Sequence, residues 1–318
     1  MRDAEEAGWD IAWLPDSQFV WRDVWSCMAL SATNTNEILL GTCVTNFETR
    51  HASVTAAAAA TIEELAPERV LLGVGTGDSS IKTLGLKPTK LDRMREQIGL
   101  IRELHTGEEV DFQGRAMRLK AASGRPTPIY LAANGPKALA LAGEIADGVI
   151  LIVGLVPELI ENALGHIKEG ADRAGRSVDD IDICVGTFCH VTDDERVKAR
   201  IVKPYVVGTA QTGGREALQN IGIDIDPPAV VGGIYPDMAH AEDWEQATEA
   251  AGEWVTDEMG LLYADAFCMI GSAEHCIEQL ENAVALGVDN FYIRHFESYT
   301  LPHEVLRAFG DSIIPRFA

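Results

Sequence analysis

The sequence predicts an α/β protein of the TIM (β/α)8 barrel class in which the first strand is absent. Apolar, strand-like runs alternate with helical segments along most of the 318 residues, a pattern typical of parallel sheets with right-handed crossovers. Seven such runs can be counted, and the chain opens partway through a helix. A barrel lacking its first strand explains both observations, and we expect a truncated sequence or a misassigned start. An open, doubly wound sheet is the alternative.

The run from Val70 to Asp78 is the clearest strand. It reads Val-Leu-Leu-Gly-Val and then enters the turn Gly-Thr-Gly-Asp. A continuous apolar run suits a strand buried on both faces, and glycines allow a ligand to approach the backbone closely. We therefore expect the carboxyl end of this strand to face a cofactor.

The remaining elements follow from local patterns taken in order. Residues 52–65 are rich in alanine, the strongest helix former, and residues 91–105 carry apolar side chains at helical spacing. Residues 109–119 alternate around a turn, as a small hairpin does. Further strands are expected at 11–14, 37–45, 129–133, 148–153, 181–191 and 290–295. Further helices are expected at 2–7, 24–33, 135–145, 159–174, 194–202 and 274–286.

Two stretches interrupt this alternation, at about 79–128 and 204–262. Neither is a linker or a low-complexity segment, so we interpret both as insertions in a single barrel domain spanning 1–318. The second contains several aromatic residues. They would either stack on a planar substrate or, as we favour, form core or dimer contacts. These residues are Tyr205, Tyr235, Trp244, Trp254 and Tyr263.

Composition excludes several classes of function. Acidic residues outnumber basic ones by 49 to 26, and a net charge of −23 argues against nucleic-acid and membrane-surface partners. No apolar segment reaches the roughly 18 residues of a membrane span. The six cysteines contain no C-x-x-C pair and several lie in apolar runs. Reduced, mostly buried thiols in a cytoplasmic protein are the plain interpretation.

Polar or glycine-rich residues follow four of the expected strands, at 16–17, 43–46, 75–78 and 132–137. Because the loops after parallel strands share one face of a barrel, we expect these four segments to meet there. Asn134 is placed to cap the next helix, with Pro136 in its first turn, and such a helix start either binds a phosphate or is simply a cap. Residues 76–78 would alternatively be an ordinary turn.

Asp16 and Asp78 are the candidate catalytic residues. Asp16 would accept a hydrogen bond, move a proton or merely cap a helix, and Asp78 would exchange a proton with a substrate from a partly buried position. The eight histidines lack metal-ligand spacing, so no metal site is expected. His51 is interpreted as a structural or capping residue, while His190 and His295 are second-rank candidates. Neither a G-x-S-x-G elbow nor a Walker A motif is present.

Several of these segments together resemble the luciferase-like flavin and deazaflavin oxidoreductases, the bacterial luciferase superfamily. Within it, they are most similar to the coenzyme F420-dependent branch that includes the methylenetetrahydromethanopterin reductases. The resemblance lies, in the family's order, in residues 8–16, 41–46, 49–51, 73–78, 128–137, 142–148 and 285–290.

The resemblance implies that F420, or alternatively FMN, binds at the carboxyl ends of the strands. It implies a non-proline cis peptide at Cys43–Val44 that presses against the ring. The ring would also contact Asp16, Asn46, Thr76, Gly77 and Asp78. The phosphate-bearing tail would lie along Ala133, Asn134, Gly135 and Pro136.

Hydride would then pass between C5 of the deazaflavin and a small-molecule substrate such as a methylene-tetrahydropterin. Ser17 stands where several sugar-phosphate dehydrogenases of this branch have histidine, which argues against glucose-6-phosphate oxidation. An FMN-dependent monooxygenase with a partner reductase and a degenerate, non-catalytic barrel are the alternatives. The family also implies a homodimer or a higher homo-oligomer.

Overall fold

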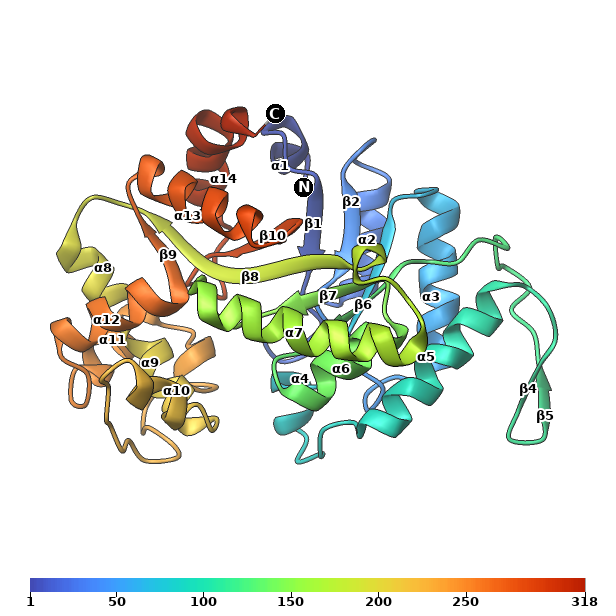
Figure 1. The fold of residues 1–318 in the computed structure, drawn as a ribbon, viewed down its shortest axis with the longest axis horizontal. Helices are drawn as coiled ribbons and strands as arrows, with labels where there is room; N and C mark the ends of the chain where they lie inside the picture. The colour runs from blue at the N-terminus through green and yellow to red at the C-terminus, as the bar shows by residue number, and fades with distance from the viewer. Residues whose placement is uncertain (318) are drawn as a thin grey trace. The chain divides into compact units, whose positions relative to one another are not determined.

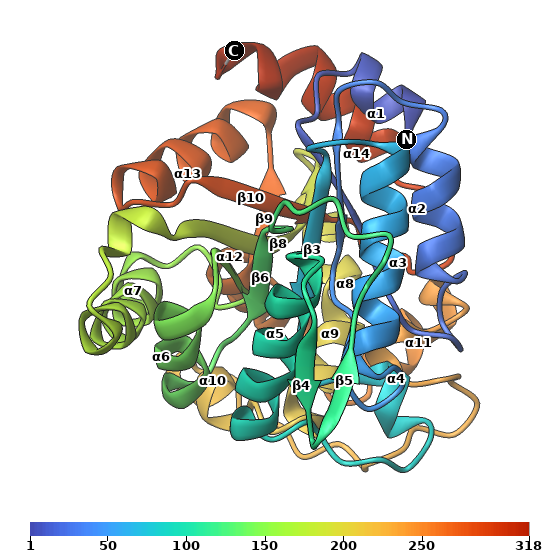
Figure 2. The same ribbon diagram turned by 90° about the vertical axis from the view of Figure 1, so that its right-hand side faces the viewer.

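The computed structural model describes residues 1–317 and divides them into two compact units (Figures 1 and 2). The first unit comprises Met1–Ile152 and Asn162–Cys184, and the second comprises Val153–Glu161 and the chain from Val185 onward. Within residues 1–317, no helix is long and apolar enough to cross a membrane.

The first unit is built on five parallel strands that neighbour one another in the order β1-β2-β3-β6-β7. They are β1 (Ile11–Leu14), β2 (Leu39–Thr42), β3 (Val70–Val74), β6 (Ile129–Ala132) and β7 (Gly148–Leu151). Every residue of β3 is buried, which confirms the prediction of a strand covered on both faces. In the register of β3 with β6, Leu72 pairs with Ile129.

Helices cover these strands, and Figure 2 shows α2, α3 and α5 side by side. The helices are α1 (Arg2–Glu6), α2 (Val24–Ala32), α3 (Ala52–Leu65), α4 (Ser79–Lys82), α5 (Leu91–His105), α6 (Pro136–Ile145) and α7 (Pro157–Ala174), followed by the 3-10 turn η1 (Val178–Asp180). The apolar face predicted for α5 is buried at Met94, Ile98, Ile101 and Leu104. The expected hairpin is also present, as β4 (Val110–Phe112) and β5 (Arg115–Met117).

The second unit contains most of β8 and the last two strands. Strand β8 (Asp182–Val191), whose first three residues belong to the first unit, follows β7 in the strand order, and β10 (Asn290–Arg294) follows β8. Strand β9 (Cys268–Gly271) lies off this path and pairs with β8 in parallel. The seven predicted strands are therefore confirmed, and β9 is an eighth strand that the sequence analysis missed.

The stretch interpreted as a mixed insertion, 204–262, is largely helical. The helices of the second unit are α8 (Glu195–Ile201), α9 (Lys203–Gln211), α10 (Arg215–Asn220), α11 (Trp244–Ala251), α12 (Asp257–Phe267), α13 (Ala273–Ala285) and α14 (His303–Ala308), with the short turns η2 (Met238–His240), η3 (Phe309–Ile313) and η4 (Ile314–Arg316). That 79–128 and 204–262 are insertions in one barrel domain stays a prediction.

The second unit packs around an aromatic cluster. The ring of Phe188 lies 3.9 Å from that of Tyr205 and 5.2 Å from that of Phe296. The guanidinium of Arg294 stacks on Phe188 at 4.1 Å. Tyr205, Trp244 and Tyr263 are buried in this core, which confirms the preferred interpretation for these three aromatics. Trp254 packs at its edge, whereas Tyr235 is 57% exposed and lies outside this core, so a dimer or substrate contact of Tyr235 stays a prediction.

Candidate active site

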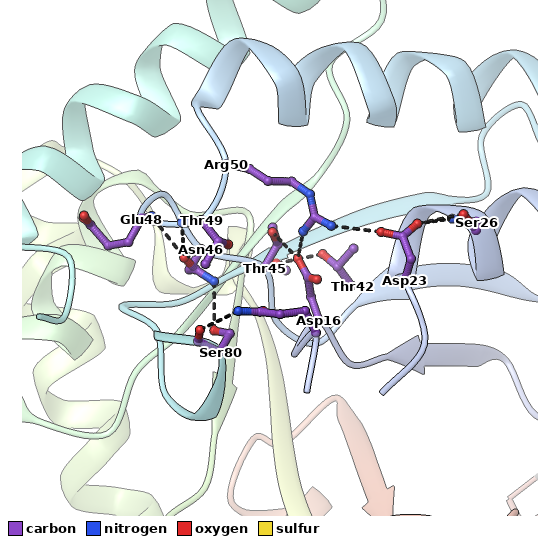
Figure 3. A network of polar contacts seen from close by, with 12 residues as sticks. Asp16, Asp23, Ser26, Thr42, Thr45, Asn46, Glu48, Thr49, Arg50 and Ser80 are labelled. Atoms are coloured by element: carbon purple, nitrogen blue, oxygen red, sulfur yellow. Dashed lines mark hydrogen bonds and ion pairs between the residues drawn. The ribbon is translucent and has the colours of Figure 1, made fainter. Parts of the chain in front are cut away.

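Asp16 lies just beyond the end of β1 and is one of the few buried acidic side chains, with 6% of it exposed. Its Oδ2 accepts a hydrogen bond from Thr45 Oγ1 at 2.8 Å and forms an ion pair with Arg50 Nη1. Figure 3 shows the carboxylate between these two donors. The capping interpretation of Asp16 is wrong, because its bonds go to side chains far along the chain.

Arg50 also binds a second carboxylate, that of Asp23. Its Nη2 donates to Asp23 Oδ2 at 3.0 Å. Asp23 is in turn the N-cap of α2 and accepts from the Ser26 backbone N–H at 2.9 Å and from Ser26 Oγ at 2.8 Å. The Ser26 amide and the neighbouring Arg50 lower the pKa of Asp23 below its ordinary value. One arginine therefore connects two carboxylates, one buried and one at a helix start.

The segment after β2 is fixed against β3. The peptide bond between Cys43 and Val44 is cis, which confirms that prediction, and both residues are half-buried. Pairing resumes beyond it, since Thr45 N donates to Gly73 O at 3.0 Å and Gly75 N donates to Thr45 O at 2.9 Å. A Cβ on Gly75 would lie 2.6 Å from Val44 Cγ2, so the close approach of the two segments requires glycine there.

Asn46 connects this segment to α4. Its Nδ2 donates to Ser80 Oγ at 3.0 Å, while its Oδ1 accepts from the backbone N–H groups of Glu48 and Thr49 at 3.0 Å each. The Ser80 carbonyl accepts from Gln18 Nε2 at 2.8 Å. The loops that follow β1, β2 and β3 are thus joined by hydrogen bonds, as expected for strand ends that share one face (Figure 3).

Ser17 belongs to the same network. It is buried, and its hydroxyl lies 2.8 Å from that of Ser79, the first residue of α4. At the position where related dehydrogenases were expected to carry histidine, this chain therefore holds a structural hydroxyl pair.

The glycine turn after β3 is placed differently from the prediction. Gly77 has a φ of +96°, which only glycine adopts readily, and the Thr76 carbonyl accepts from Thr89 N at 2.8 Å. Asp78, however, is not partly buried as expected: 66% of its side chain is exposed, and it forms an ion pair with Lys82 one helical turn later. The carboxylate of Asp78 therefore lies mostly in solvent.

The fourth strand end corrects another prediction. Asn134 does not cap α6, because its Oδ1 accepts from Ile152 N at 2.8 Å and Gly135 is the N-cap. Pro136 is in the first turn, as predicted. Ala133 is 4% exposed, whereas a Cβ on Gly135 would meet no atom within 4 Å. The backbone at Gly135 and Pro136 is consequently open to an extended ligand.

The structure thus brings Asp16, Asn46 and residues 43–45 together with Ser80, and it places 133–136 at the end of β6, the strand beside β3. The sequence placed Thr45 among the strand ends expected to meet, but it assigned Arg50 and Ser80 no part in this network. The available signal was a cation and a hydroxyl in the segment after β2, one strand away from the acid after β1.

The structure shows the hydrogen bonds of two of the histidines considered above, His51 and His295. His51 is the N-cap of α3 and accepts from Ser53 N at 3.2 Å, which confirms its capping role. His295 accepts from Glu297 N at 3.0 Å in the second unit, where burial lowers its pKa. Among residues 1–317, no group of three or more His, Cys, Asp or Glu side chains is arranged to hold a metal ion.

Parallel strands that alternate with helices, three of them joined by one polar network at their carboxyl ends, define an α/β protein of the barrel class. Residues 1–290 match the family model described as luciferase-like monooxygenase. The chain belongs to this family.

Among its relatives are two 5,10-methylenetetrahydromethanopterin reductases. The protein from Methanolobus tindarius is 34% identical over 90% of this chain and 85% of its own length, and that from Archaeoglobus fulgidus is 33% identical over the same shares. An F420-dependent glucose-6-phosphate dehydrogenase from Mycobacterium tuberculosis is 38% identical over 56% of this chain and 60% of its own length.

Solved structures confirm the predicted fold class, a luciferase-like TIM barrel. The coenzyme F420-dependent tetrahydromethanopterin reductase of Methanopyrus kandleri matches 99% of this chain and 93% of its own with a TM-score of 0.77 at 24% identity. An F420-dependent secondary alcohol dehydrogenase matches 98% of this chain and 92% of its own with a TM-score of 0.72 at 18% identity.

Proposed function

We propose that this chain is an F420-dependent oxidoreductase that transfers hydride between the deazaflavin and a small-molecule substrate. The observation that carries the proposal is the network joining the ends of β1, β2 and β3, in which a nine-tenths-buried carboxylate is held at the expected ring position. The family and the F420-dependent activities named for its relatives support it.

The residues present suit a deazaflavin. Asp16, Asn46, Thr76 and Gly77 supply polar and backbone groups around the half-buried Cys43–Val44 peptide, which would lie against a flat ring. Ala133, Asn134, Gly135 and Pro136 form the open strand end suited to an extended tail. F420, when bound, supplies the hydride-carrying carbon C5.

Asp78 is assigned a limited part in this proposal. With two thirds of its side chain exposed beside Lys82, it is able to exchange protons with solvent at the rim of the site. Asp16, by contrast, is held by Thr45 and Arg50 and orients a bound ligand. Both remain the candidate catalytic residues.

We infer that the substrate is a methylene-tetrahydropterin or a similar conjugated molecule. The reductases that carry this activity in their names align with nine tenths of the chain, whereas the glucose-6-phosphate dehydrogenases align with little more than half. The engagement of Ser17 with Ser79 also argues against a sugar-phosphate substrate that needs a base at this position.

Titration with F420 and with FMN tests the cofactor assignment. We expect quenching of F420 fluorescence at micromolar protein and no saturable binding of FMN. Tight FMN binding without F420 binding would instead identify an FMN-dependent monooxygenase, which the family description also covers. Binding of neither cofactor would identify a non-catalytic barrel.

We further propose a homo-oligomer formed through α2 and α3. These two helices are neighbours. Helix α2 contains no charged residue, and α3 contains none before Glu63. The whole chain, by contrast, carries 75 Asp, Glu, Lys and Arg residues. Leu30 is 66% exposed on α2 and Val54 is 55% exposed on α3. Exposed apolar patches of this kind are typical of protein interfaces.

Light scattering coupled to gel filtration tests this interface. The wild-type chain is expected to elute as a dimer or larger, and Leu30→Glu with Val54→Glu to elute as a monomer. Val230→Glu, which places the same charge at a 78%-exposed valine of the second unit, serves as the control. A monomeric wild type would disprove the interface.

The cytoplasmic location expected from the cysteines stays a prediction.

A further inference from the structure

We propose that Arg50 is a positioning residue that fixes Asp16 as a hydrogen-bond acceptor for the cofactor ring, and that Asp23 holds Arg50 in place for this purpose. The inference rests on the proposed function, because it assigns a task within the same site. Asp16 already belongs to the expected ring site, whereas Arg50 and Asp23 have had no task assigned to them.

The two oxygens of Asp16 are used unequally. Thr45 Oγ1 and Arg50 Nη1 both bind Oδ2. From residues 1–317, no hydrogen bond reaches Oδ1. Oδ1 is not one of the fully enclosed, unpartnered side-chain oxygens of these residues, so a donor on a ligand is able to reach it. We infer that Oδ1 is the atom that a bound ligand satisfies.

Arg50 is well suited to set this orientation. A planar guanidinium with two terminal nitrogens is able to hold two carboxylates at once in a fixed geometry, which a lysine ammonium does less well. Arg50 uses Nη1 for Asp16 and Nη2 for Asp23, so the direction of the arginine is fixed at both ends. With Arg50 anchored, the ligand does not have to order the arginine on binding, which favours affinity.

Asp23 supplies the rigid end of this arrangement. Its Oδ1 is bound to Ser26 N and Ser26 Oγ at the start of α2, which leaves Oδ2 for Arg50. Asp23 is itself half-exposed, at 51% of its side chain. The positioning chain thus runs from the N-terminus of α2 through Asp23 and Arg50 to Asp16.

The combined charge of Asp16, Asp23 and Arg50 determines which kind of ligand atom binds here. Two carboxylates and one guanidinium leave a net charge of −1, with the buried Asp16 presented as an acceptor. Such a site attracts an N–H or O–H donor and repels phosphate and carboxylate. It therefore fits the ring of a flavin-type cofactor, whose pyrimidine edge carries an N–H, and not the anionic tail.

A double-mutant cycle read by cofactor binding tests the inference. Asp16→Asn and Arg50→Gln are each expected to weaken F420 binding roughly tenfold or more, because a hydrogen bond to a charged group is lost or misdirected. Arg50→Lys should recover part of the loss, and Asp23→Asn should weaken binding a few-fold. The matched control is Arg95→Gln, which breaks the exposed ion pair with Glu144 elsewhere in the first unit.

The double variant Asp16→Asn/Arg50→Gln is decisive. If Arg50 acts only through Asp16, this variant binds F420 no more weakly than Asp16→Asn alone. Additive losses, or an Arg50→Gln variant that binds like wild type, would overturn the inference. Thermal unfolding of each variant identifies any that fails to fold, in which case Arg50→Lys replaces Arg50→Gln in the cycle.

The outcome also separates this inference from the proposed function. Wild-type binding of FMN instead of F420, with the same coupling between Asp16 and Arg50, would disprove the F420 assignment and support the positioning role. If the wild type binds F420 but Asp16 and Arg50 are not coupled, the F420 assignment is supported and the positioning role is disproved. Binding of neither cofactor would overturn both.

Discussion

Asn46 Nδ2 donates to Ser80 Oγ across a distance of 3.0 Å, and this one bond ties the segment after β2 to the helix that follows β3. Both side chains are almost completely buried, with residue exposures of 1% and 4%. Removing either partner leaves the other without its hydrogen bond in the protein interior.

We therefore expect Ser80→Ala to lower the free energy of unfolding by about 1–3 kcal/mol, the usual cost of a buried polar group left unpaired. Urea denaturation measures this change, and the exposed Ser123→Ala serves as a control that should stay within about 0.5 kcal/mol of wild type. Equal stability of the two variants would mean that the Asn46–Ser80 bond is not formed in solution.

The exposed pair of Asp78 and Lys82 allows the chemical role of Asp78 to be isolated. Asp78→Ala and Lys82→Ala remove the same ion pair, so both should change stability by less than about 1 kcal/mol. If Asp78 exchanges protons at the site, only Asp78→Ala lowers kcat, and it does so more than it weakens F420 binding. Equal kcat values for the two variants would remove Asp78 from the mechanism.

His105 makes stability depend on pH. It is 3% exposed, its Nε2 lies 3.1 Å from the carbonyl of Ala56, and burial lowers its pKa from the ordinary value of 6.5. Below pH 6.5 the unfolded chain takes up a proton at this histidine that the folded chain does not, so the free energy of unfolding falls as the pH drops.

Urea denaturation at pH 7.5 and 5.5 checks this prediction. Wild type should lose more stability between these values than His105→Gln, by up to about 1 kcal/mol. The variant should keep the loss of stability caused by His295, whose pKa is also lowered by burial. Identical losses in the two proteins would contradict the assignment.

Two glycines on α7 should respond in opposite ways to the same substitution. A Cβ on Gly170 would lie 1.9 Å from the Ala140 carbonyl oxygen of α6, whereas a Cβ on Gly165 would meet no atom within 4 Å. Gly170→Ala is expected to destabilise by about 1–3 kcal/mol through overpacking. Gly165→Ala is expected to stabilise by about 0.5–1 kcal/mol, because alanine favours the helix. Thermal or urea unfolding distinguishes them, and a stabilising Gly170→Ala would rule out close contact of the two helices.

The sequence predicted correctly the helices whose own residue pattern is sufficient to specify a helix. The alanine-rich α3 and the amphipathic α5 begin and end where their patterns do, at 52–65 and 91–105. Strand β9 was missed because it follows α12 directly, with no turn residue between Phe267 and Cys268.

The location of the candidate site could be predicted from the sequence, but the directions of several of its side chains could not. The sequence identifies the strand ends, since the parallel arrangement alone brings them to one face. It does not reveal that Asn134 turns towards Ile152, that Asp78 faces solvent, or that Arg50 reaches Asp16 across 34 residues. These orientations depend on contacts between side chains distant in sequence, which no local pattern encodes.

The confinement of the candidate site to one unit has an evolutionary consequence. Asp16, Asn46, Thr76 and Gly135 all belong to the first unit, while the second packs around its own aromatic cluster at Phe188 and Tyr205. The hydrogen bonds and the ion pair of Asp16, Thr45, Asn46, Arg50 and Ser80 with one another are all made within the first unit. A substitution confined to the second unit therefore removes none of these bonds, so selection can vary that unit while the polar network inherits the same set of side chains.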